Sequence, residues 1–327
     1  MRRNLHAGRL RSNGLGLKVL TQDEMEDIHL ATLEVLERTG VFIEDVEARD
    51  LFAAADCQVD AGQGIVKIPP YVVEDAIRSA PAKLVLCGRS SDNDFVLEDG
   101  RVGFTSFGEG LRVVDPYTGE TRDSTKQDVA DCSRIIDALS DIDVIERPVG
   151  AHDVPQDAVP LHNAEAIFTN TTKHAFIAPL TGYLAKRMRD MATVIVGGSD
   201  NLRERPILSW VVATISPLKV THDVCQIIIE GARSSVPVLI CPNAMAGATS
   251  PVTLAGTLVT HNAETLAGIT LSQIARRGAP VIYGSATTAM DLRFATASVG
   301  TPECALLSAS AAQIARRYLL PSWVAGA

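Results

Sequence analysis

The chain has 327 residues, of which 46% are hydrophobic and 21% are charged, and this is enough apolar material for a large core. Its formal net charge of −9 argues against nucleic acid or an anionic membrane as a partner, because both bind basic surfaces. The six cysteines include no CxxC pair, the N-terminus lacks the apolar run of a signal peptide, and no segment has the roughly 18 apolar residues of a membrane span. We therefore expect a cytoplasmic globular protein with reduced thiols.

An N-terminal arm is expected to precede the first helix. Residues 1–20 are basic and rich in glycine and show no hydrophobic period, so they are interpreted as an arm that is disordered or that orders on contact. The first helix has clear boundaries: Thr21 caps it, Glu24 completes a capping box, and Gly40 stops it. Three elements follow, namely a helix over 44–55, a strand over 65–69 and a helix over 70–79.

Residues 83–122 change to an alternating pattern. The segments KLVLCGR, DFVLEDG, RVGFTS and LRVVDPYTGET alternate in polarity and are punctuated by Gly, Asp and Pro, which predicts antiparallel hairpins. Glu109, in the FGEG run between them, is interpreted as a turn carboxylate rather than as an acid that reaches a reaction site. Residues 21–123 are therefore expected to form an α+β extension that differs from the rest of the chain.

From residue 124 onward, helices and short apolar strands alternate at a spacing of about 30 residues, which predicts βα units and a parallel sheet. The expected helices cover 125–140, 158–172, 182–197, 218–234, 252–277 and 302–317. The expected strands cover 143–150, 173–180, 206–215, 237–243, 279–285 and 321–326. The predicted fold class is α/β, with residues 124–327 forming a (βα)8 TIM barrel that is truncated after about six strands.

The last predicted strand, in YLLPSWVAGA, has no helix after it. Because an uncovered apolar strand is sticky, the chain is expected to be cut off there, with on the order of 60 residues of the barrel missing. The truncated chain by itself is expected to be unstable or prone to aggregation, and inactive. The alternative fold is an open doubly wound sheet, although neither GxGxxG nor GxxxxGK[ST] follows any strand.

In a barrel, the reactive groups lie just beyond the C-terminal ends of the strands. The predicted strand ends place there His152, Thr214, Ser216, Asn243, Tyr283, Gly284 and Gly326. His152 is either a general acid or substrate ligand, or a loop histidine bonded to Asp153. Tyr283 either donates a hydrogen bond into the site or packs with its hydroxyl satisfied. This set is poor in carboxylates, and no HExxH, HxH or Cys/His cluster predicts a metal site.

Polar residues inside predicted helices are interpreted mainly as structural. His261, Asn262 and Glu264 lie within the long helix over 252–277, where a buried hydrogen-bond network is favoured over direct catalysis. His222 and Cys225 have helical spacing, but two ligands alone do not hold a metal ion. The visible residues therefore leave the reaction undecided.

Several runs together resemble the trimethylamine:corrinoid methyltransferase family. They are TGVFIED, VDPYTGETRDST, ISPLKVT, PNAMAGATSPVTLAGTLVTHNAETLAG and LLPSWVAGA, and the fourth run is the most specific. The resemblance implies a (βα)8 barrel with an N-terminal α+β elaboration that demethylates a methylated amine. The methyl group passes to cobalt(I) on a separate corrinoid protein, so this chain itself binds no cofactor. A corrinoid protein and a small amine are the implied partners, and a homo-oligomer is expected at full length.

The resemblance also implies a reason for the abrupt end. In the amine-using branch the position after LLPSWVAGA carries pyrrolysine, which is encoded by an amber codon, so we expect a TAG codon directly after Ala327. Sequencing the gene through codon 328 tests this expectation. Homologues that lack this residue act on quaternary amines, so a fragment of a glycine betaine-type methyltransferase is the first alternative. A naturally short, six-stranded protein without enzymatic activity is the second.

Within this resemblance, residues at the predicted barrel mouth receive roles from their placement alone. His152 and Tyr283 are the expected catalytic residues, and Tyr283 also offers an aromatic face to a cationic amine. Residues expected to bind the substrate are Asn243, Thr214, Ser216, Gly284 and Gly326.

Overall fold

The computed structural model describes residues 17–106, 108 and 110–326. Most of the expected N-terminal arm and Glu109 therefore lie outside the described residues. The chain forms two compact units: unit 1 is Leu84–Val211, and unit 2 joins Gly14–Lys83 to Val212–Ala327. These units do not divide at the domain boundary expected between residues 123 and 124, which stays a prediction.

Unit 2 begins with the helix whose boundaries the sequence indicates. In α1 (Gln22–Glu34), the Thr21 side chain accepts from the Glu24 N–H and the Glu24 carboxylate accepts from the Thr21 N–H, so the capping box is confirmed. A π-helical turn, η2 (Val35–Thr39), extends the helix to Gly40, whose φ of +80° favours glycine. Of the expected arm, Val19 and Leu20 donate their N–H groups to Oε1 of Gln313, at 2.7 and 3.1 Å.

Two sequence runs that are far apart pair in a small sheet of unit 2. Its strand order is β11–β1–β3–β2, with β1 (Val41–Ile43) parallel to β11 (Lys219–Val220) and antiparallel to β3 (Ile65–Lys67), which pairs with β2 (Gln58–Asp60). The helix expected over 218–234 is wrong in its first turn: 219–220 is a strand, and α8 (His222–Ser234) starts after it. Non-local pairing with β1 explains this difference. Helices α2 (Val46–Ala54) and α3 (Pro70–Ser79) complete this region.

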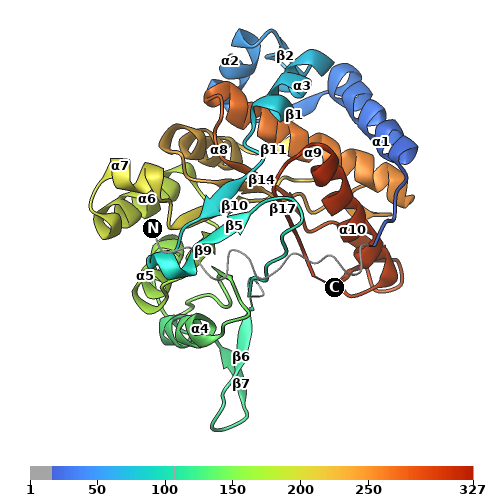
Figure 1. The fold of residues 1–327 in the computed structure, drawn as a ribbon. Coiled ribbons are helices and arrows are strands. Elements are labelled where there is room, and N and C mark those ends of the chain that lie inside the picture. Colours follow the sequence, from blue (N-terminus) through green and yellow to red (C-terminus); the bar gives the residue numbers. More distant parts are fainter. Residues whose placement is uncertain (1–16, 107, 109, 327) are drawn as a thin grey trace. The chain divides into compact units, whose positions relative to one another are not determined.

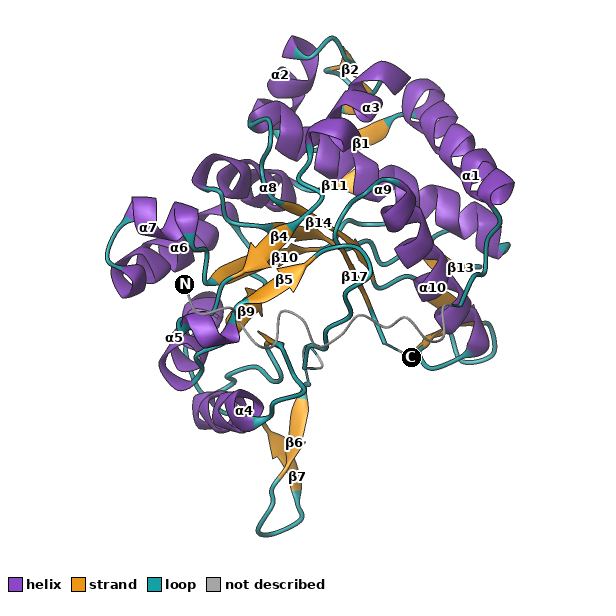
Figure 2. Cartoon of the chain, in the orientation of Figure 1, coloured by secondary structure: helices purple, strands orange, loops and turns teal. Residues whose placement is uncertain are grey.

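The parallel strands of unit 2 are β12 (Val238–Ile240), β14 (Val281–Ser285) and β17 (Ser322–Val324), paired in that order. The long helix α9 (Leu254–Ala275) and α10 (Pro302–Arg317) lie between them in the chain. Helices α1, α2 and α3 pack along α9 (Figure 2). A further sheet was not predicted from the sequence, with strands β13 (Met245–Ala246), β15 (Thr288–Asp291) and β16 (Thr296–Ser298).

Unit 1 contains the other parallel strands, β8 (Val144–Glu146), β9 (His174–Ile177) and β10 (Leu208–Val212), the last ending at the boundary with unit 2. The helices between and around them are α4 (Lys126–Ala138), η4 (Gln156–Ala158), α5 (Val159–Asn170), α6 (Gly182–Val196) and α7 (Ser199–Glu204). The alternation of βα units is confirmed, and the fold is α/β. Each strand is shorter than expected.

Two of the expected hairpins form in unit 1. β4 (Leu84–Leu86) pairs with β5 (Phe95–Leu97) around the 3-10 turn η3 (Ser91–Asn93), and β6 (Arg112–Val114) pairs with β7 (Thr121–Asp123). The segment 101–106 was expected to form a strand of a hairpin, and this expectation is wrong. Thr105 instead makes a parallel bridge with Val144. This segment lies along the edge of β8 that β9 does not occupy, which satisfies backbone groups there.

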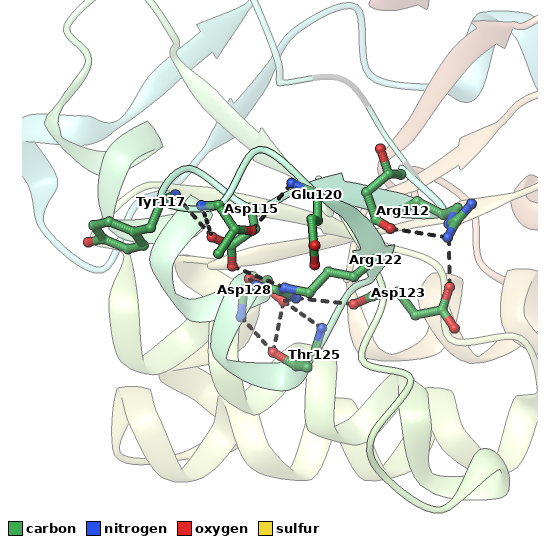
Figure 3. Close-up of polar contacts among 10 residues, drawn as sticks. Arg112, Asp115, Tyr117, Glu120, Arg122, Asp123, Thr125 and Asp128 are labelled. Carbon is green, nitrogen blue, oxygen red and sulfur yellow. Dashed lines mark hydrogen bonds and ion pairs between the residues drawn. The ribbon is translucent and has the colours of Figure 1, made fainter.

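The β6–β7 hairpin extends away from α4 (Figure 1), and ion pairs fix its base (Figure 3). The Arg122 guanidinium donates to both carboxylate oxygens of Asp128, at 2.7 and 2.9 Å, and to Asp115 at 3.3 Å. This arrangement lowers the pKa of Asp128, and the hydrogen bonds from Arg122 are the main cause. The same Asp128 closes a capping box with Thr125 at the start of α4, so the hairpin is tied directly to a helix terminus.

Lys173, just before β9, binds backbone carbonyl groups at the C-terminal end of α4 and in the turn after it. Its Nζ donates to the carbonyl oxygens of Ile136, Leu139 and Ile142, at 2.7, 2.5 and 2.6 Å, and the side chain is buried. We expect Lys173→Met to lower the free energy of unfolding by about 2–3 kcal/mol, because three carbonyls lose a charged donor. Urea denaturation checks this value. Lys186→Met, at an exposed position of α6, is the control, and an equal loss in both variants would contradict the interpretation.

Candidate active site

Glu146 stands at the C-terminal end of the first parallel strand. The strand expected over 143–150 ends at Glu146, four residues earlier than expected. The side chain at the end of this strand is therefore a carboxylate, and His152 lies six residues further on. The sequence reasoning missed Glu146 because it placed this residue inside the strand.

The surroundings of Glu146 hold its backbone in place and leave half of its carboxyl free. The Ser106 hydroxyl accepts from the Glu146 N–H at 2.9 Å and donates to the Glu146 carbonyl at 2.6 Å. Gly108 passes so close that a Cβ there would lie 2.6 Å from Oε1 of Glu146. The other oxygen, Oε2, is buried and has no hydrogen-bond partner in the part of the chain that the structure describes. Burial raises the pKa of this carboxyl to about 7, although a hydrogen bond from Thr105 opposes the rise.

The strand register puts the polar side chains Glu146, His174 and Ser209 on one face of the unit 1 sheet, here called the polar face, which also carries Phe176. Glu146 pairs with Phe176, and Phe176 pairs with Ser209, so these three side chains form a row on one face. His174 lies on the same face, where its Nε2 contacts the Ser209 hydroxyl at 2.7 Å and its Nδ1 contacts the Cys87 carbonyl at 3.0 Å. The opposite face carries the apolar side chains Ile145, Ala175, Ile177, Leu208 and Trp210.

Tyr283 belongs to a buried hydrogen-bond network in unit 2. Its hydroxyl donates to Oδ1 of Asn262 at 2.9 Å, and the side chain is fully buried. Nδ2 of Asn262 donates to the Tyr318 hydroxyl at 2.8 Å and to the Thr32 hydroxyl at 2.9 Å. The interpretation of Asn262 as part of a buried network is therefore confirmed. The structure also shows Tyr283 with its hydroxyl satisfied, which is one of the two alternatives that the sequence left open.

The network continues from Tyr318 towards the surface. The Tyr318 hydroxyl accepts from Asn262 and lies 2.9 Å from Nδ1 of His29. Nε2 of His29 lies 2.7 Å from the Glu74 carboxylate. Each side chain of the network therefore has a hydrogen-bond partner, and satisfied partners are what allow a buried polar network to stabilise a fold.

Glu264 organises the loop that follows β10. Its carboxylate accepts hydrogen bonds from the hydroxyls of Thr214 and Ser216, the second at 2.9 Å, and from the Leu218 N–H at 2.9 Å. Burial raises the pKa of Glu264, and these three donors oppose the rise. Leu218 has a φ of +54°, an unfavourable backbone conformation that the bond to Glu264 helps to hold. Thr214 and Ser216 thus both use their hydroxyls on Glu264.

His261, on α9, is fully buried, like His174. Its Nδ1 lies 3.0 Å from the Thr287 hydroxyl, which is directly beyond β14, and its ring packs edge-on against Tyr283. Burial lowers the pKa of His261 to about 3, so the ring is neutral, and none of the described residues bonds its Nε2.

The remaining residues expected in the site are spread over the two units. In unit 1, His152 is exposed, and its Nδ1 lies 3.1 Å from the Ser124 carbonyl. One of the two alternatives had His152 bonded to Asp153, and in the structure Asp153 accepts from the Lys126 N–H. In unit 2, Asn243 and Gly326 are exposed and Gly284 is buried.

Tyr283 and Gly284 cannot share one site, because neighbouring residues of a strand point to opposite faces. Tyr283 faces α9, where its hydroxyl bonds Asn262. Gly284 faces the other side together with Trp323, its partner on β17. A Cβ at Gly284 would lie 2.6 Å from Leu239 Cδ1, so glycine is needed at this close approach. Trp323 is half-buried, and it is the aromatic side chain that the sequence reasoning missed on this face.

His222 and Cys225 have structural partners. Nδ1 of His222 lies 2.7 Å from the Asp45 carboxylate, and Cys225 is buried within α8. In the part of the chain that the structure describes, no group of three His, Cys, Asp or Glu side chains is arranged to hold a metal ion. Among those same residues, no helix is long and apolar enough to cross a membrane.

Comparison with known proteins assigns the chain to a family. The family model for trimethylamine methyltransferase (MTTB) matches residues 3–327. The chain belongs to the trimethylamine methyltransferase family. The resemblance seen in the sequence runs is therefore confirmed across the whole chain.

Individual relatives agree with this assignment. The trimethylamine methyltransferase MttB of Desulfitobacterium hafniense is 48% identical over 326 residues, which is 100% of this chain and 66% of that protein. MttB1 of Methanosarcina mazei is 43% identical over 328 residues, covering 99% of this chain and 66% of the relative. A glycine betaine methyltransferase of D. hafniense is 31% identical over 306 residues, covering 93% and 63%. The chain thus spans just under two thirds of the length of these relatives.

A solved structure shares the fold at low sequence identity. The monomethylamine methyltransferase MtmB of Methanosarcina barkeri matches with a TM-score of 0.54 and 15% identity, over 95% of this chain and 69% of that one. A hydroxylamine complex of MtmB matches with a TM-score of 0.55. This likeness concerns the fold alone.

Proposed function

We propose that the protein that carries this chain transfers a methyl group from trimethylamine to the cobalt of a separate corrinoid protein. The observation that carries the proposal is the family match over residues 3–327, together with 48% identity to a trimethylamine methyltransferase along the entire chain. We further propose that the βα units of this chain are part of an eight-stranded barrel, in line with the fold shared with MtmB.

The amine must carry a positive charge when its methyl group is transferred. Trimethylamine is protonated at neutral pH, and a methyl group leaves nitrogen readily only if the amine carries a positive charge. When the carbon–nitrogen bond breaks, its electron pair stays on nitrogen and neutral dimethylamine leaves. The corrinoid partner supplies the cobalt(I) electron pair that forms the new bond to carbon. The task of this protein is to orient the ammonium group and to keep its proton on nitrogen.

The glycine betaine relative suggests a quaternary amine as the second candidate substrate. Its identity of 31% is lower than the 43–48% of the trimethylamine enzymes, so trimethylamine is favoured. The free cysteines are consistent with the proposed cytoplasmic location, because thiols persist in a reducing compartment. A homo-oligomer at full length remains part of the proposal.

Methyl transfer can be measured directly. The protein that carries this chain is mixed with the reduced corrinoid protein and trimethylamine, the cobalt absorbance is followed, and dimethylamine is quantified by proton NMR. We expect one dimethylamine for each methylated corrinoid and no reaction with glycine betaine. Demethylation of glycine betaine without reaction of trimethylamine would overturn the assignment of the substrate.

A further inference from the structure

Glu146 offers a hydrogen-bond acceptor that none of the described residues uses. Its Oε2 is buried and has no partner among them, at the C-terminal end of β8, where barrel enzymes place reactive groups. The backbone on both sides is fixed by Ser106, and Gly108 packs against Oε1. A buried oxygen without a partner costs about 1–3 kcal/mol of stability. Such a group persists where a ligand supplies the missing donor.

The strand register places an aromatic ring beside this acceptor. Phe176 of β9 is the register partner of Glu146, so the two side chains lie next to each other on the polar face of the sheet. Phe176 itself is almost fully buried, in edge contact with His174 at 5.7 Å between ring centroids. A carboxylate beside an aromatic ring is the combination that binds an alkylated ammonium ion: the oxygen accepts an N–H, and the ring attracts the cationic methyl groups.

We propose that Glu146 and Phe176 bind the ammonium group of the substrate, with Oε2 accepting its single N–H, and that this pair selects a tertiary over a quaternary amine. This inference rests on the proposed function. Trimethylammonium has one N–H, so it satisfies Oε2 and exposes three methyl groups. A quaternary ammonium ion has a fourth carbon in place of that hydrogen, so it leaves Oε2 unpaired and crowds it.

The same contact fits the direction of the reaction. The hydrogen bond to Oε2 holds the proton on nitrogen while the carbon–nitrogen electron pair is left behind there. Dimethylamine then leaves with that proton as its N–H. Glu146 therefore neither gains nor loses a net proton during the transfer. It fixes which nitrogen substituent points away from the cobalt, which makes it a residue for orientation and specificity.

The test compares binding and turnover of Glu146→Gln and Phe176→Leu with the unaltered protein that carries this chain. Calorimetric titrations use trimethylammonium chloride and tetramethylammonium chloride at pH 8. We expect the unaltered protein to bind trimethylammonium about 30-fold more tightly, and Glu146→Gln to lose most of this preference. Phe176→Leu is expected to weaken both ions about fivefold without changing the ratio. In turnover, Glu146→Gln should lose about 30-fold in kcat/KM for trimethylamine.

Two controls keep the result interpretable. Asp141→Asn changes an exposed carboxylate in the turn before β8 and should leave binding unaltered. Thermal melts establish that each variant is folded at the temperature of the titration. If Glu146→Gln keeps both the preference and the turnover within threefold, Oε2 is satisfied by a water and the inference is wrong. If the unaltered protein does not demethylate trimethylamine at all, the proposed function fails, and the two outcomes are therefore distinguishable.

Discussion

Replacing Glu264 by alanine should lower the free energy of unfolding by about 4 kcal/mol. Three donors converge on this buried carboxylate, from Thr214, Ser216 and Leu218. Alanine leaves all three donors without their acceptor. It also leaves a cavity beside α9, where the buried Glu264 side chain had been. The left-handed Leu218 loses the bond that helps to hold it.

Urea denaturation at pH 7 measures this effect, and a double-mutant cycle assigns it. Thr214→Val removes one donor while keeping the shape of the side chain. We expect the two substitutions together to cost about 1–2 kcal/mol less than the sum of the single losses, because they remove one shared bond. Glu303→Ala, at the exposed start of α10, is the control for the loss of a glutamate from a helix. Additive losses in the cycle would mean that the Thr214 bond contributes nothing.

Local sequence signals predicted most of the helices and the parallel strands. The Thr21 and Glu24 capping box sets the start of α1, and the period of strands and helices from residue 124 gives the βα units. These features depend on residues within a few positions of each other. The pairing of β1 with β11 joins residues 42 and 219, and no local pattern encodes it. The helix start at 218 was wrong for this reason.

The candidate site was harder to predict because it depends on where strands end and which way side chains point. A strand that ends at Glu146 rather than at residue 150 moves the candidate reactive position from a loop histidine to a carboxylate whose Oε2 is buried. The alternation of strand side chains separates Tyr283 from Gly284. This alternation could have been applied to the sequence, and it would have shown that the two residues serve different faces. The burial that raises the pKa of Glu146 could not have been seen without the fold.

Substituting Glu146 by glutamine should make the protein more stable at alkaline pH and leave its stability unchanged in acid. Burial raises the pKa of this carboxyl from 4.5 to about 7, so the folded protein binds the proton more tightly than the unfolded chain does. Ionisation of Glu146 therefore opposes folding. The cost is absent below pH 4.5, grows between pH 4.5 and 7, and is complete above pH 7. A shift of this size corresponds to about 3 kcal/mol.

Two ionisable neighbours, His174 and Arg147, keep their charge state across most of this window. On the same face His174 has its pKa lowered to about 4 by burial, and the adjacent Arg147 stays an arginine cation even though burial lowers its pKa. Asp143, the residue before β8, accepts from the Phe104 N–H at 3.1 Å.

The measurement is urea denaturation of Glu146→Gln and of the unaltered protein at pH 4 and pH 8. We expect equal stabilities at pH 4 and a gain of about 3 kcal/mol for the variant at pH 8. Asp141→Asn should show no such difference between the two pH values. A Glu146→Gln variant that is less stable at pH 8 would mean that the carboxylate is stabilised by its surroundings. Together with a loss of amine binding, the expected gain would show that this protein keeps an ionisable group at the end of β8 for its ligand, at the expense of its own stability.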